Sequence, residues 1–129
     1  MKPAKIEELI NKVVVKVVFD KEKVIFECDD GCNFLMTHDQ QCCEVVELVD
    51  GQDDLYLLNG QKILMAEEVS QEERSDYKTW TFYKLGAING YVNLRWLGQS
   101  NGCYSERVDL FWVKKEEYCC YSDRVDLFW

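Results

Sequence analysis

The feature that most constrains the fold of this chain is a series of short segments in which apolar and polar residues alternate. A period of two places every second side chain on the same face of a β-strand, whereas a helix needs a spacing of three to four. Residues 12–19 show the pattern clearly, and the face they predict carries Val13, Val15, Val17 and Phe19. The alternation therefore indicates strands rather than helices.

Turn-forming residues divide the first half of the chain into several such strands. Asp29-Asp30-Gly31 is a typical turn sequence, and we expect strands at 12–19, 23–28, 32–38 and 44–49, followed by a short apolar segment at 62–67. Residues 3–11, which begin with the only proline, predict one short helix. A single helical turn is expected over 50–56. The first three strands predict an N-terminal β-meander.

The second half predicts another meander, with strands at 77–87, 91–97 and 103–112. Asn89-Gly90 favours a two-residue hairpin turn, because both residues tolerate positive φ. The polar run 68–76 is interpreted as an exposed loop. The fold class expected is α+β, mainly antiparallel β, with one face of the sheet apolar and the other wet. Residues 1–115 form one domain in this interpretation, and 116–129 form a tail.

An internal repeat marks that tail. Residues 103–112 recur at 120–129 with one difference, Glu106 against Asp123. Two copies are too few for a solenoid. A recent duplication that the fold tolerates is one interpretation, and truncation after Lys115 should then leave the domain folded. The alternative is that the second copy pairs with another chain and forms a homodimer, because identical strands fit the same place in a sheet.

Charge is distributed unevenly along the chain. The net charge is −9, and residues 24–77 alone carry a net −12. Solvated acidic loops would explain this, as would an acidic face that meets a basic partner. Binding to duplex nucleic acid is not expected, because phosphate contacts need a Lys/Arg patch.

The N-terminal residues lack the uninterrupted apolar core of a signal peptide, and no segment reaches the roughly 20 apolar residues of a membrane span. We therefore expect a cytoplasmic protein with no membrane contact, in the host cytoplasm if it is viral. Thiols stay reduced in that compartment, so the seven cysteines are interpreted as free thiols. Adjacent cysteines such as Cys42 and Cys43 are a poor disulfide framework.

One segment concentrates residues that could carry chemistry. His38, Cys42, Cys43 and Glu44 lie close together in sequence, with Cys28 and Cys32 one strand earlier. Cys and His are zinc ligands, but the spacing lacks paired short knuckles, so a polar cluster is favoured over zinc and no cofactor is predicted. A Cys–His nucleophile pair is a further alternative.

The candidate binding residues lie in the second meander and in an acidic turn. Trp and Tyr dominate the centres of protein interfaces. The predicted contact surface consists of Trp80, Tyr83, Tyr91, Asn93 and Arg95, together with Asp50, Asp53 and Asp54.

Three sequence blocks suggest a family. His-Asp-Gln-Gln-Cys-Cys-Glu at 38–44, Trp-Thr-Phe-Tyr-Lys-Leu at 80–85 and Ser-Asn-Gly-Cys-Tyr-Ser at 100–105 resemble a group of short phage- and bacteria-encoded proteins of unknown function. The resemblance covers about residues 12–113 and implies no activity. It implies a viral origin, where small acidic proteins often block host defences.

We therefore expect a non-catalytic interaction protein that binds, and inhibits, a host protein such as a nucleic-acid-handling defence enzyme. Two alternatives remain at this point: sequestration of a nucleotide-like small molecule by Asn93, Arg95 and the aromatic rings, and a Cys/His metal-binding domain.

Overall fold

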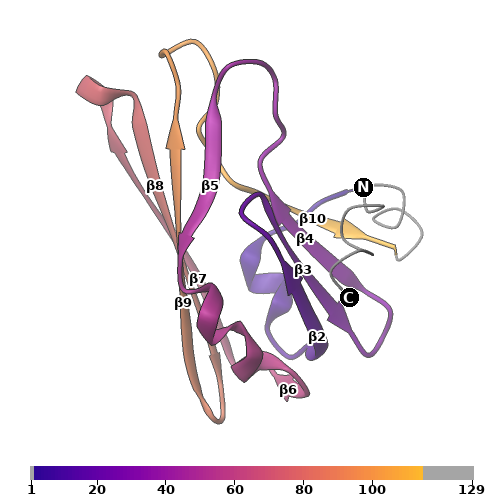
Figure 1. The fold of residues 1–129 in the computed structure, drawn as a ribbon. Helices are drawn as coiled ribbons and strands as arrows, with labels where there is room; N and C mark the ends of the chain where they lie inside the picture. Colours follow the sequence, from indigo (N-terminus) through magenta and orange to yellow (C-terminus); the bar gives the residue numbers. More distant parts are fainter. Residues whose placement is uncertain (1, 115–129) are drawn as a thin grey trace.

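Ten antiparallel strands form two sheets in the computed structural model, which describes residues 2–114 (Figure 1). The elements in chain order are β1 (Lys2–Pro3), η1 (Ile6–Leu9), β2 (Val13–Phe19), β3 (Lys23–Cys28), β4 (Asn33–Thr37), β5 (Val45–Asp50), η2 (Gln52–Leu58), β6 (Gln61–Lys62), β7 (Met65–Glu73), η3 (Arg74–Asp76), β8 (Lys78–Ala87), β9 (Gly90–Gln99) and β10 (Asp109–Val113). The expected mainly antiparallel β class is confirmed. The second repeat copy and the tail from 116 onward lie outside the described residues.

The two sheets have different strand orders. Sheet A runs β1-β10-β4-β3-β2-β6, and sheet B runs β5-β9-β8-β7. The strands predicted at 12–19, 23–28, 32–38 and 44–49 are present as β2 to β5. The N-terminal helix is shorter than predicted, because only η1 is helical and it is a 3-10 turn. No helix formed by residues 2–114 is long and apolar enough to cross a membrane.

The strands that make up the second meander differ from those predicted. β10 does not follow β9 into sheet B but crosses to sheet A, where it pairs with β4 and β1. The third strand of the meander is instead β7, which pairs with β8 from Met65 to Glu73. The interpretation of 68–76 as a loop is therefore wrong. An edge strand with both faces in water has no apolar alternation that could reveal it.

The hairpin turn between β8 and β9 is also displaced by one residue. Ala87 pairs with Gly90, so the two loop residues are Ile88 and Asn89 rather than Asn89 and Gly90. Positive φ occurs at Gly90, at 141°.

A β-bulge changes which side chains of β2 are buried. The register against β3 shifts between Val14 and Lys16. Val14 is buried, whereas Val15 and Phe19 are exposed. The predicted single apolar face of this strand is therefore wrong, because one extra residue in a bulge reverses the faces beyond it.

The main core lies between the two sheets, which stand as separate layers in Figure 1. It combines side chains of both sheets with those of η1 and η2, and its largest members include Phe26, Phe34, Leu55, Leu85 and Trp96. Apolar burial of this kind is the main stabilising term in folding.

Candidate docking face and crossover cluster

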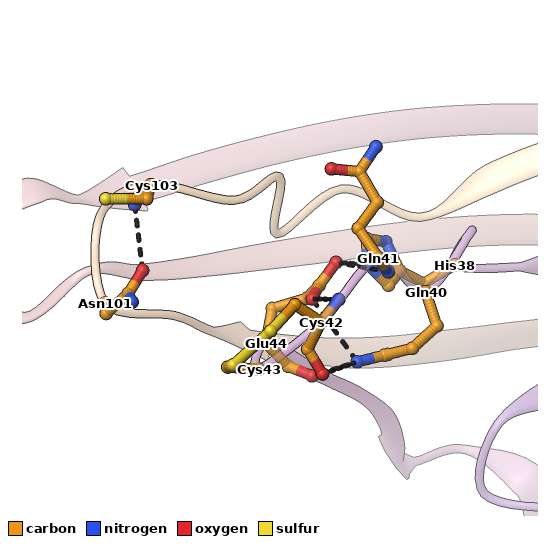
Figure 2. The surroundings of a disulfide bond; sticks show 8 residues. All are labelled: His38, Gln40, Gln41, Cys42, Cys43, Glu44, Asn101 and Cys103. Carbon is orange, nitrogen blue, oxygen red and sulfur yellow. Dashed lines mark hydrogen bonds and ion pairs between the residues drawn. A yellow bond between two sulfur atoms is a disulfide. The ribbon is translucent and has the colours of Figure 1, made fainter.

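Four connections within residues 2–114 cross from one sheet to the other, and one histidine joins two of them. Residues 38–44 lead from β4 to β5, and residues 100–108 lead from β9 to β10. The Nε2 of His38 lies 2.8 Å from Oε2 of Glu44, and its Nδ1 lies 2.7 Å from the carbonyl oxygen of Arg107 (Figure 2 shows the Glu44 side). Both partners are acceptors, so the ring makes both bonds together only as the imidazolium. We call His38, Glu44 and the Arg107 carbonyl the crossover cluster.

Glu44 is almost fully buried and is held as a carboxylate. The backbone N–H groups of Gln41 and Cys42 donate to its two oxygens at 3.0 and 2.8 Å, in addition to the bond from His38. Burial opposes ionisation, but the hydrogen bonds from Cys42, His38 and the neighbouring backbone outweigh it and lower the pKa of Glu44 to about 2. The cluster therefore fixes a charge between the two sheets.

The sulfur atoms of Cys42 and Cys43 are bonded to each other (Figure 2). The expectation of free thiols is wrong for this pair, which is exposed in a connection where no core packing holds the side chains apart. His38 faces Glu44 rather than a thiol, so the Cys–His pair is not formed. Within residues 2–114 no group of three or more His, Cys, Asp or Glu side chains could hold a metal ion.

Cys28 and Cys32 do not extend this cluster. Both are free, and Cys28 is buried. Burial, with Asp30 nearby, raises the pKa of Cys28 to about 12, so this thiol stays protonated.

Glu106 anchors the second connection, and the sequence analysis did not select it. Its carboxylate accepts hydrogen bonds from Thr79 of β8, at 2.8 Å, and from Ser100. The signal was present in the repeat, because this is the one position where the copies differ.

The outward side chains of β5, β9, β8 and β7 form an open sheet surface, which we call the open face. One row across it is Val69, Phe82 and Arg95, and Arg95 lies 3.6 Å from Asp50 at the next strand. Other members on the same side include Glu67, Trp80, Lys84, Tyr91 and Asn93. Of the predicted contact residues, Asp50, Trp80, Tyr91, Asn93 and Arg95 are thus brought together.

Cations stack on the rings of this face. The guanidinium of Arg95 lies 5.3 Å from the centre of the Trp80 ring, and Nζ of Lys84 lies 4.6 Å from that of Tyr91. The Trp80 indole N–H also donates to Glu73 at 3.2 Å. These contacts hold the flat rings against the sheet and leave Phe82 and Val69 between them.

Three predicted contact residues lie elsewhere. Tyr83 is 1% exposed and belongs to the core, so its assignment to a binding surface is wrong. It is out of phase with Trp80 and Phe82 along β8, and burial raises the pKa of its hydroxyl, with Glu68 contributing. Asp53 and Asp54 are exposed but lie on η2 rather than on a strand of the open face.

The class of protein defined by these features is a two-sheet antiparallel β domain in which a buried charge ties two of the crossovers and the second sheet leaves one face open. The chain belongs to the family described as a domain of unknown function (DUF7448), which matches residues 7–110. No curated protein matches the sequence. No solved structure matches it either.

Proposed function

We propose that this protein is a non-catalytic interaction protein that binds a partner protein through the open face. The observation that carries the proposal is exposed apolar area on an ordered sheet: Val69 is 60% exposed, Tyr91 57% and Phe82 36%. Apolar and aromatic side chains grouped on one face are typical of protein-binding surfaces.

Charge complementarity supports a partner with a basic surface. β7 forms the free edge beside the open face, and Glu67, Glu68, Glu72 and Glu73 lie along it. Residues 24–77 carry a net −12. Basic surfaces are common on proteins that handle nucleic acid. The partner class that we propose is a host defence enzyme of that type. The protein would inhibit the enzyme by occupying its basic surface. The viral origin implied by the sequence blocks is part of the same proposal.

The open face suits a nucleotide-like ligand less well. A groove of about 400 Å³ runs across it, lined in part by Asp50, Glu67, Lys84, Asn93 and Arg95. The two carboxylates would repel phosphate groups, which offsets the attraction of the two cations.

The experiment that tests the proposal compares matched variants in affinity capture from host lysate. The face variant is Phe82→Asp, and the control is Tyr56→Asp on η2, which adds the same charge at another exposed ring. We expect wild type and control to capture one stoichiometric partner, which salt releases. The affinity for this partner should be at least about tenfold lower in the face variant. Equal capture by both variants, or no stoichiometric partner, would contradict the proposal.

A further inference from the structure

The outward side of sheet A carries an apolar row that crosses four strands. Phe111 of β10 pairs with Leu35 of β4, Leu35 pairs with Ile25 of β3, and Ile25 pairs with Val18 of β2. Val113 lies two residues beyond Phe111 on the same side. These five residues form a cluster separate from the main core, and we call it the outer row.

Three of the five residues of the outer row are buried and the other two are partly buried, unlike the equivalent surface of the other sheet. Ile25 is 1% exposed, Leu35 3% and Val113 0%, whereas Val69 on the open face is 60% exposed. Both sets point away from the space between the sheets. An outward side chain on an uncovered sheet keeps contact with water, so the difference requires a cover over the outer row.

No element within residues 2–114 supplies that cover. The buried side chains of η1 (Ile6, Leu9) and of η2 (Leu55, Leu58) belong to the main core instead. η1 packs against β7, and η2 packs mainly against β2 and β9.

We propose that the second repeat copy, residues 120–129 of the same chain, packs on the outer row. The chain leaves β10 at Val113, which is itself part of the row, so the following residues start beside it. Fifteen further residues can span up to about 50 Å, whereas crossing from β10 to β2 takes only about 15 Å. The length of the tail is therefore ample.

The residue pattern of the copy fits an apolar surface. Val125, Leu127 and Trp129 occupy every second position, with Asp126 and Phe128 between them, as Val108, Leu110 and Trp112 do in the first copy, where all three contact the main core. A segment with this alternation buries one face when it lies on a sheet.

The same chain is a better source of the cover than a second copy of the protein. Covalent attachment through a few residues gives an effective concentration of roughly millimolar. If two chains exchanged residues 120–129, each outer row would receive the same contacts that its own chain can supply. The inference concerns the sheet opposite to the open face, so it does not depend on the proposed function.

Nuclear Overhauser contacts in the full-length wild type test the inference directly. We expect contacts between the methyl groups of Leu127 and those of Leu35 or Ile25 in a uniformly labelled sample, and none in an isotope-filtered mixture of labelled and unlabelled chains. Absence of these contacts would overturn the proposal. Contacts seen only between chains would overturn it in favour of a dimer.

A pair of variants provides the independent check. Leu127→Asp places a charge on the apolar side of the copy, and Ser122→Asp places the same charge on a residue of the same segment outside the Val125–Leu127–Trp129 set. With a water-soluble paramagnetic agent, the methyl signals of Ile25 and Leu35 should broaden in Leu127→Asp and remain sharp in Ser122→Asp and wild type. Protected signals in Leu127→Asp would overturn the inference, and the native mass of each sample reports whether the protein is a monomer.

Discussion

At the residue scale, Glu44 shows how a buried charge can serve as a structural tie. Its carboxylate accepts hydrogen bonds from His38 and from two backbone N–H groups, and it lies on the path from sheet A to sheet B. His38 extends the tie to a second crossover, residues 100–108, through the carbonyl of Arg107. Charge-assisted hydrogen bonds of this kind are stronger than neutral ones. A buried polar group that loses its hydrogen-bond partner destabilises the folded state.

The first prediction concerns the pH dependence of stability. The pKa of Glu44 is lowered from 4.5 to about 2 in the folded state, so its contribution is full above about pH 4.5 and is lost as the pH falls towards 2. Glu44→Gln should lower the urea midpoint at pH 7, and the difference from wild type should narrow as the pH falls to about 2. Exposed Glu67→Gln controls for the loss of one charge. A constant difference at every pH would contradict this role.

At the element scale, the sites where backbones approach closely decide how β9 and the connection after it pack. A Cβ added at Gly98 would overlap the carbonyl oxygen of Glu106 and lie 2.8 Å from its Cβ. Glu106 is in turn held by Thr79 and Ser100, so this backbone cannot easily withdraw. Gly98 therefore permits the second connection to lie against the sheet before β10 crosses to sheet A.

The second prediction follows from that contact. Gly98→Ala should reduce the free energy of unfolding by about 1–3 kcal/mol, the usual cost of overpacking. Gly86→Ala is the matched control on the neighbouring strand, where the added Cβ would meet the ring of exposed Tyr91 at 3.0 Å. That contact and the one with Cβ of Met65 at 3.3 Å are longer than the contact of Gly98 with the Glu106 backbone, so the control should cost less. Denaturant unfolding of the two variants measures the difference, and an equal or larger loss in Gly86→Ala would contradict the assignment.

At the scale of the whole molecule, one core joins both sheets. Phe26 and Phe34 of sheet A contact the same cluster as Leu85 and Trp96 of sheet B. The crossovers at 38–44 and 100–108 link the sheets covalently as well, and His38 links the two crossovers. A shared core and shared ties make independent unfolding of either sheet unfavourable.

The third prediction is that the two sheets unfold in one transition. Phe26→Ala, which truncates a fully buried side chain of sheet A, should cost about 3–5 kcal/mol. Circular dichroism and the indole NMR signal of Trp96, which lies in sheet B, should report the same shifted midpoint. A Trp96 signal that keeps its wild-type midpoint while the circular dichroism midpoint falls would show that the sheets are separate units.

Part of the candidate site could be predicted and part could not. Asn93 and Arg95 were placed on the outward side of β9 because their alternation with Val92, Leu94 and Trp96 is unambiguous. Tyr83 was misplaced because β8 is aromatic or β-branched on both sides, so its pattern does not say which side faces the core. The bond between Cys42 and Cys43 was missed because it depends on the local path of one connection.

The sequence alone determined where most strands begin and end, since alternation and turn residues act over a few neighbouring positions. Tertiary structure decided which sheet each strand joins. The same ten-residue pattern occurs twice, at 103–112 and at 120–129. The pattern alone therefore does not predict that β10 pairs with β4 rather than with β9. Only the packing of side chains distant in sequence, through the common core and the His38 tie, distinguishes these places. Strand formation is local, whereas the choice of partner strand depends on long-range contacts.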